Sequence, residues 1–202
     1  MIVKAAQQRT DPAVILDVVA ALLESNGYDK WQLDDVAEGA RVSLATIYKH
    51  FPSRGELTLA ALERWMEIHA YGPIENRAPG EPLFDALIRM LRTIFEPWEK
   101  HPEMLDAFMR ARWAVGGERL RAQGDASVGP MREAFAGLDP SDAADLGDIL
   151  ANVTLGALSR YVSGEIRVKE IVPAIERMLS WLNEPPERIS RQSGRKRSSS
   201  AS

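Results

Sequence analysis

The chain has 202 residues, of which 45% are hydrophobic and 27% charged, values typical of one globular domain or two small ones. The absence of cysteine excludes disulfide bridges, thiol catalysis and cysteine-ligated zinc or iron–sulfur clusters. The three histidines lie far apart in sequence, so we predict neither a metal nor another cofactor. The net charge of −4 counts against general affinity for nucleic acid. Residues 1–9 lack the apolar core of a signal peptide and no apolar run is long enough for a membrane span, which favours a cytoplasmic protein.

Apolar residues at helical spacing, bounded by capping residues, predict about nine helices and no strand, so the expected fold class is all-α. In chain order the helices are expected over residues 12–26, 33–40, 44–51, 53–70, 83–100, 105–113, 131–135, 140–164 and 168–183. A Gly- and Pro-rich stretch over residues 71–82 marks a hinge between two regions. We predict an N-terminal domain over 1–57, a second helical domain over 58–186, and a disordered, basic, Ser-rich tail over 187–202.

Two of the predicted helices, over residues 33–40 and 44–51, are too short to be stable alone. Packed at a steep angle on the first helix, they form a helix-turn-helix. Its inward face is supplied by Leu33, Val36, Ala37, Ala40, Val42, Ile47 and Phe51. Ser43 stands at the N-cap of the second short helix, where its hydroxyl satisfies a free backbone amide.

The opposite face of that second short helix suits the major groove of DNA, because it combines donors, acceptors, a methyl group and one cation on a slim helix. This face presents Leu44, Ala45, Thr46, Tyr48, Lys49 and His50. The helix N-termini at Ser43 and Ser53 carry partial positive charge that suits phosphate oxygens, and Arg54 adds a full charge.

The segments Gly27-Tyr28, 33–37, Val42-Ser43 and 46–54 closely resemble the DNA-binding domain of TetR-family transcriptional regulators. The resemblance covers residues 11–65, and its Tyr-x-His-Phe-Pro-Ser ending is specific. It implies an all-α homodimer, most often a repressor, whose C-terminal domain binds a small effector that weakens operator binding. It also implies that Tyr48 and His50 touch backbone phosphates, that Ala45 and Thr46 approach bases, and that Arg54 holds a phosphate.

Three positions depart from the usual pattern of this family. Arg41 replaces a turn glycine and is expected to take a left-handed backbone conformation at a modest energetic cost. Gln32 replaces a capping threonine, and Leu44 replaces a common cation of the reading face. Residues 1–57 hold six Lys or Arg against eight Asp or Glu, so we predict weak nonspecific DNA affinity and a shallow dependence on salt.

The second region is rich in bulky aromatic and methionine side chains, which form a hydrophobic core and leave room for an apolar ligand between helices. The candidate effector-binding residues are Trp65, Phe84, Leu87, Leu91, Phe95, Trp98, Met104, Phe108, Met109, Trp113 and Asn152. Arg110 and Arg112 are further candidate anchors, although solvated surface is the simpler interpretation of both. This half is similar to TetR regulators of lipid or steroid breakdown, which implies a largely apolar effector such as an acyl thioester or a sterol-like acid.

The last two long helices, over about 140–164 and 168–183, carry more apolar residues than one interior face can bury. By the family resemblance they pair with their twofold mates as a four-helix bundle. A twofold dimer places two reading helices about one DNA turn apart, so the operator is expected to be near-palindromic. The expected partners are therefore double-stranded DNA, an apolar effector and a second copy of the chain, with no membrane.

Two other classes of function remain open on the residues alone. A helical small-molecule-binding protein without DNA binding fits the acidic N-terminal half. An all-α enzyme is less well supported, because the sequence shows no nucleophile elbow, phosphate loop or paired-histidine motif. Tyr48 and His50 also have a purely structural interpretation, in which each side chain packs or caps.

Overall fold

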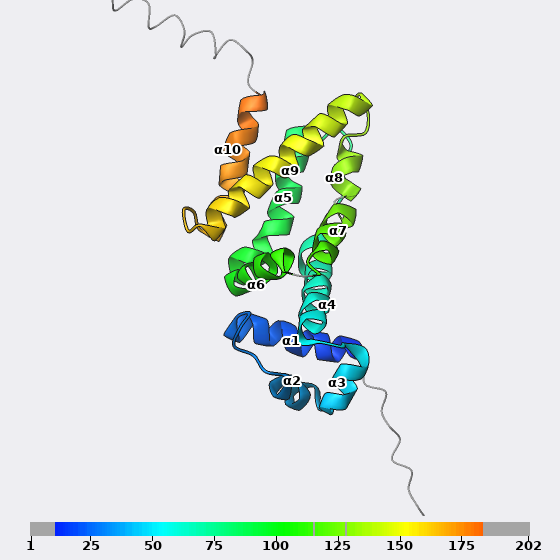
Figure 1. Ribbon diagram of the computed structural model, residues 1–202. Coiled ribbons are helices and arrows are strands. Elements are labelled where there is room, and N and C mark those ends of the chain that lie inside the picture. The colour runs from blue at the N-terminus through cyan, green and yellow to red at the C-terminus, as the bar shows by residue number, and fades with distance from the viewer. Residues whose placement is uncertain (1–10, 115, 128, 184–202) are drawn as a thin grey trace, which may run out of the picture.

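The computed structural model describes residues 11–114, 116–127 and 129–183 (Figure 1). Every regular element within these residues is a helix, which confirms the all-α fold class. The N-terminal part contains α1 (Pro12–Asn26), α2 (Leu33–Ala40), α3 (Leu44–His50) and α4 (Arg54–Met66), with a π-helical turn over Glu67–Tyr71. The rest contains α5 (Leu83–Lys100), α6 (Pro102–Trp113), α7 (Glu118–Ser127), α8 (Gly129–Ala134), α9 (Pro140–Val162), a 3-10 turn (Val168–Glu170) and α10 (Ile171–Asn183). The predicted tail over 187–202 lies outside the described residues.

Side-chain caps fix where four of the helices begin. Asp11 accepts from the Ala13 amide at 3.0 Å and Ser43 from the Thr46 amide at 3.1 Å. Ser53 likewise accepts from an amide of α4 at 3.1 Å, and Asp139 from an amide of α9 at 2.9 Å. Each of these hydrogen bonds satisfies a donor that the helix itself leaves free. These helices begin at Pro12, Leu44, Arg54 and Pro140, within one residue of the expected starts.

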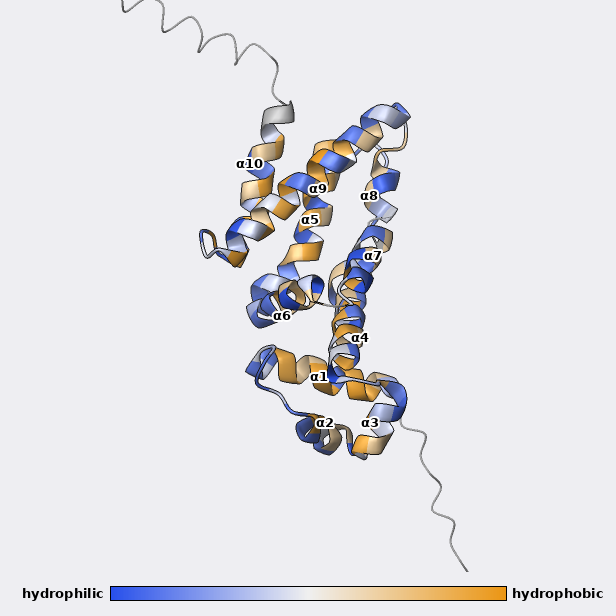
Figure 2. Cartoon of the chain, viewed as in Figure 1, coloured by the Kyte–Doolittle hydropathy of each residue, from blue (hydrophilic) through white to orange (hydrophobic). Residues whose placement is uncertain are grey.

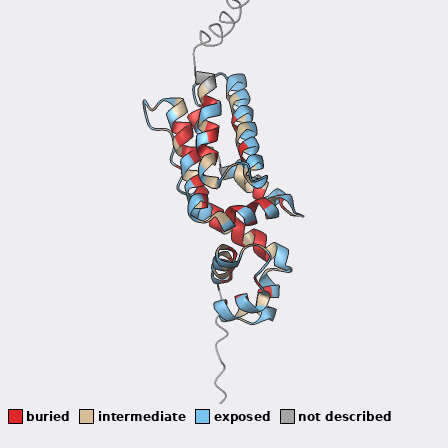
Figure 3. Cartoon of the chain, turned by 90° about the vertical axis from the view of Figure 1, so that its left-hand side faces the viewer, coloured by how far each residue is buried: buried red, intermediate tan, exposed pale blue. Residues whose placement is uncertain are grey.

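Helices α1, α2 and α3 form the lower end of the molecule in Figure 1, and α1 packs against α4 and α6. The core of this end consists of fully or almost fully buried side chains, namely Ile15, Val19, Leu23, Trp31, Val36 and Ile47. Figure 3 shows that the outer surface of this end is largely exposed. The small N-terminal helices are thus held to the body by α1 and α4.

In the C-terminal part, α5 contacts α6, α8 and α10, while α9 pairs with α10. Helix α7 was not expected from the sequence pattern, because it is largely hydrophilic (Figure 2) and Leu120 is its fully buried side chain. Ion pairs hold it instead. The Arg119 guanidinium donates to Glu56 and to Glu63, both on α4, at 2.6 Å each.

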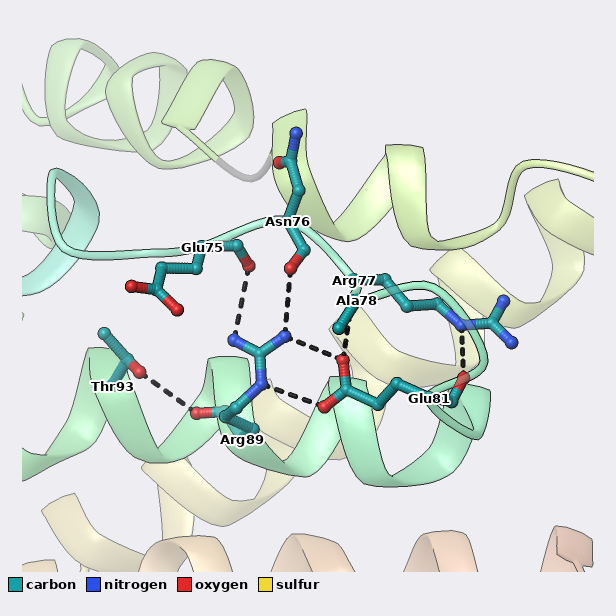
Figure 4. Close-up of polar contacts among 7 residues, drawn as sticks. All are labelled: Glu75, Asn76, Arg77, Ala78, Glu81, Arg89 and Thr93. Atoms are coloured by element: carbon teal, nitrogen blue, oxygen red, sulfur yellow. Dashed lines mark hydrogen bonds and ion pairs between the residues drawn. The ribbon is translucent and has the colours of Figure 1, made fainter.

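The predicted hinge over residues 71–82 is fixed by hydrogen bonds rather than left free (Figure 4). Arg89 of α5 donates to both carboxylate oxygens of Glu81 at 3.0 Å, and also to the carbonyl oxygens of Glu75 and Asn76. The guanidinium, together with the Ala78 amide, lowers the pKa of the Glu81 carboxyl to about 2. The predicted boundary near residue 57 falls inside α4, which runs from the N-terminal helices into the body without a break.

Among the described residues, no helix is both long enough and apolar enough to cross a membrane.

Candidate DNA-binding surface and effector region

The turn between α2 and α3 depends on a left-handed residue. Arg41 has φ 54° and ψ 44°, as the departure from glycine predicts. This conformation lets the Arg41 amide donate to Glu38 O at 3.1 Å and the Val42 amide donate to Ala37 O at 3.0 Å. These bonds satisfy carbonyl groups at the end of α2 and redirect the chain into α3.

Close packing sets the position of α2 against α1. A Cβ atom built on Gly39 would lie 2.8 Å from Cγ1 of Val18, which is closer than real side chains approach. Of the small residues expected on the inward face of α2, Ala40 is buried and Ala37 half-buried. Gly39 is the residue that permits the close approach, because it has no side chain between the two helices.

Helix α3 packs on the N-terminal core through one side and exposes the other side to solvent. Ile47 is 1% exposed and holds the helix down, whereas Tyr48 on the outer side is 49% exposed. The predicted DNA-facing residues Leu44, Ala45, Lys49 and His50 are also exposed, and Thr46 is half-buried. The Thr46 hydroxyl lies 2.9 Å from the Ser43 hydroxyl. The structure therefore brings the predicted reading residues together on one accessible face.

Two further residues singled out in the sequence, Gln32 and Arg54, lie on either side of α3 and are also exposed. Gln32 occupies the N-cap of α2, where its backbone amide donates to the Asp35 carboxylate at 2.9 Å. Arg54 begins α4, donates to Tyr28 O at 2.9 Å and lies 4.4 Å above the ring centre of Trp31. These contacts hold the Arg54 side chain in one place while leaving several of its donors for other groups.

A set of contacts that sequence reasoning missed joins the N-terminal helices to the body. Glu24, in the last turn of α1, accepts from the indole N–H of Trp65 at 2.9 Å and lies 3.5 Å from Nδ1 of His101. Asp29 pairs with Arg110 of α6. No sequence motif marks these pairs, because the partners lie 41 to 81 residues apart.

The predicted effector residues divide into two groups. The first group belongs to the hydrophobic core where α4, α5 and α6 meet. Phe84 is half-buried and the other members are buried, namely Trp65, Leu87, Leu91, Phe95, Trp98, Met104, Phe108 and Met109. Within it, the rings of Trp65 and Trp98 lie 4.8 Å apart and those of Trp98 and Phe108 5.3 Å apart.

Trp113 and Asn152 are the second group, and the structure does not bring them to this core. Trp113 is 66% exposed and is the last residue of α6. Asn152 is exposed on α9 and donates to Asp148 O of its own helix at 2.8 Å. Neither residue lies with the buried aromatic and methionine side chains, so their part in effector binding stays a prediction.

Two open pockets lie along α5 rather than inside this core. One, of about 410 Å³, is lined by Phe84 and Ile88 with charged residues such as Arg92 and Glu176. The other, of about 270 Å³, is lined by polar residues that include His69 and His101. Phe84 is thus the one predicted effector residue that lines either of these two pockets.

The last two long helices expose apolar side chains. Ile149, Leu155 and Val162 are exposed on α9, and Met178 is exposed on α10; Val162 reaches 61% exposure. Ile171 and Ile175 of α10, by contrast, are buried in the core of the protomer. Among the side chains that the structure describes on these two helices, the exposed apolar ones therefore lie mainly on α9.

Known proteins resemble this chain in sequence and in fold. The repressor KstR of Rhodococcus jostii (strain RHA1) is 35% identical over 100 residues, covering 48% of this chain and 45% of that protein. KstR of Mycolicibacterium smegmatis is 33% identical over 105 residues, covering 52% and 51%. The chain thus matches about half the length of these curated relatives.

Solved structures extend the likeness in fold. A TetR transcriptional regulator from Rhodococcus sp. RHA1 aligns with a TM-score of 0.57 at 19% identity, covering 82% of this chain and 92% of that one. The family model for bacterial regulatory proteins of the tetR family matches residues 15–61. The model for the Tetracyclin repressor-like C-terminal domain matches residues 80–182, more than half of the chain. The chain therefore belongs to the TetR family of bacterial transcriptional regulators.

Proposed function

We propose that the protein is a ligand-responsive transcriptional repressor that binds a near-palindromic DNA operator as a homodimer. The main support is α3, whose outer face carries Tyr48, Lys49 and His50 clear of the body. A helix raised in this way fits the major groove, and flanking cations contact the backbone. The two KstR relatives, which are named as repressors, support the direction of the response.

The surface charge near α3 sets the expected strength of DNA binding. Asp34, Asp35 and Glu38 on α2 are exposed and oppose the phosphate backbone. Lys49 lies on the reading face, and Arg41 and Arg54 flank it in sequence as exposed cations. Few counterions are released when so few cations contact phosphates, so the dependence of affinity on salt is shallow.

The test is a mobility-shift assay with DNA that flanks the protein's own gene. Lys49→Ala should weaken binding and lower the salt slope by about 1, since one phosphate contact is lost. Lys169→Ala removes the same charge from the 3-10 turn before α10 and serves as the matched control. Undiminished binding by Lys49→Ala, or equal loss in both variants, would contradict the proposed interface.

We also propose that α9 and α10 form the dimer interface. The exposed side chains of Leu155 and Val162 lie seven residues apart on α9, so they share one face of the helix. A Cβ atom on Gly156 would meet nothing within 4 Å, which leaves space there for a second helix. Asn152 lies near this exposed face and is better placed at the dimer contact than in an effector site.

Sedimentation equilibrium tests this interface. The double variant Leu155→Glu, Val162→Glu should be monomeric at concentrations where the wild type is dimeric, because each carboxylate would be desolvated in the interface. Ile68→Glu places an acid at an equally exposed apolar position on the π-helical turn and should stay dimeric. A dimeric double variant would place the interface elsewhere.

The effector is proposed to be largely apolar and to bind within the C-terminal part. The buried side chains there include Met90, Met104 and Met109 beside Phe95 and Phe108, and methionines repack readily around an inserted apolar molecule. Binding would shift the population of protomer shapes and so the spacing of the two reading helices. A thermal-shift panel in which only small hydrophilic compounds stabilise the protein would refute an apolar effector.

A further inference from the structure

Three segments meet at the end of α6, away from the two pockets on α5. Arg112 belongs to α6, Tyr71 to the π-helical turn, and Arg121 and Gly124 to α7, and these elements pack together. The Arg121 guanidinium donates to the Arg112 carbonyl oxygen at 2.7 Å. A Cβ atom on Gly124 would lie 3.2 Å from the Tyr71 hydroxyl, so the phenol lies directly against α7.

The Arg112 side chain is half-buried, and its Nε is shielded from solvent without any acceptor among the described residues. Among the described residues, no carboxylate forms an ion pair with Arg112. Ten contacts between basic and acidic side chains are present elsewhere among these residues. Buried arginine donors are normally paired, because an unpaired one bears the whole cost of leaving water. The amide oxygen of Gln123 on α7 is also buried without a donor there.

The charges around Arg112 do not balance. Burial and the neighbouring Arg121 lower the pKa of the Arg112 guanidinium, while Asp125 and Tyr71 act in the opposite direction. Burial raises the pKa of Tyr71 to about 12, so its hydroxyl is a neutral donor. The Arg112 Nε thus has no acceptor among the described residues, while the neighbouring Arg121 guanidinium bonds the Arg112 carbonyl oxygen and the Tyr71 hydroxyl is neutral. An anion would supply the missing acceptor.

Arg112 also continues the apolar face of its helix. Met109 and Phe108 precede it by three and four residues, so all three side chains lie on one face of α6. Met109 and Phe108 are buried in the core. A ligand bound along this face would place an apolar tail against them and a polar head beside Arg112.

We infer that Arg112 binds the carboxylate of the effector, with the Tyr71 hydroxyl beside it, so that the ligand is an apolar carboxylic acid. This inference rests on the proposed function and names the chemical class of the effector. The planar guanidinium suits a carboxylate because two N–H groups can donate to its two oxygens together. The half-buried Arg112 and the Tyr71 phenol would favour an acid over a neutral ligand of the same shape, because the neutral ligand leaves the Arg112 Nε without an anionic acceptor.

The experiment compares decanoate with decanamide, which has the same chain and a neutral head, by calorimetric titration of the full-length protein. Decanoate should bind at least about tenfold more tightly, the effect of one charge-assisted hydrogen bond. Arg112→Gln should abolish that preference while leaving decanamide binding unchanged. Arg132→Gln removes the same charge from the exposed face of α8 and should keep the preference.

Two results with the wild-type protein alone would overturn the inference. One is equal affinity for decanoate and decanamide, and the other is no binding of decanoate up to its solubility limit. A preference retained by Arg112→Gln would overturn it as well. Thermal melts establish that each variant is folded, and Arg112→Lys, which keeps the charge but not the paired donors, should give an intermediate preference. Operator binding is measured separately without any acid, so loss of DNA binding with intact decanoate preference would refute the proposed function alone.

Discussion

Replacement of Arg41 by glycine should stabilise the protein while weakening its contact with DNA. Arg41 has φ 54°, where an L-residue costs about 1–2 kcal/mol and glycine does not. Glycine loses about 0.4–1 kcal/mol in return, because the unfolded chain gains freedom. The net gain in the free energy of unfolding is about 0–1.6 kcal/mol, the difference between these two ranges.

The matched variant is Arg41→Ala, which removes the same exposed side chain but keeps the left-handed strain. Urea unfolding followed by circular dichroism measures both, and their m-values should agree, since neither changes the surface exposed on unfolding. Arg41→Gly should be the more stable of the two, while both should lose the same amount of DNA affinity if Arg41 contacts a phosphate. An Arg41→Gly protein no more stable than Arg41→Ala would refute the strain argument.

Three further predictions concern the stability of the folded protein. Because the Arg89 and Ala78 contacts depress the folded-state pKa of Glu81 to about 2 from 4.5, its contribution to stability is present above about pH 4.5 and is lost as the pH falls toward 2. The difference in melting temperature between wild type and Glu81→Gln should therefore shrink from pH 7 to pH 3. Ser43→Ala should cost about 1 kcal/mol in urea unfolding by removing the α3 cap, whereas Ser25→Ala on the surface of α1 should cost less than about 0.5 kcal/mol. Gly39→Val should cost about 1–3 kcal/mol by forcing α2 away from α1, and adding Val18→Ala should recover part of that loss; additive effects would mean the two sites do not touch.

The helix-turn-helix could be predicted from the sequence because its signals are local. Ser43 and Ser53 cap within three residues of themselves, and Ile47 lies among exposed neighbours as the spacing of apolar residues requires. The left-handed turn at Arg41 is equally local, since it follows from the need to leave α2 and enter α3 within three residues. The role of Gly39 could not be predicted from the sequence, because it depends on the position of the Val18 side chain on another helix.

The C-terminal half was harder to predict, because its arrangement depends on long-range pairs. Helix α7 has almost no apolar stripe, and its position is set by Arg119 reaching back to Glu56 and Glu63. The predicted hinge carried Gly and Pro signals, yet Arg89 fixes it through groups that no local pattern connects. In both places the segment is held by a guanidinium that donates several hydrogen bonds. Sequence periodicity detects only segments that are held by an apolar face.

Helical spacing alone distinguishes the environments of Arg110 and Arg112. Two positions apart on a helix, their side chains point to nearly opposite sides, so they could not both be surface residues on a helix packed on one face. Arg110 pairs with Asp29 at the surface, and Arg112 turns toward α7 and the core side of α6. The apolar residues Phe108 and Met109 indicate which arginine faces inward, because they share the face of Arg112 and not that of Arg110. The pattern thus locates the inward arginine, but only the fold of α7 over it reveals that its donor is left without an anion.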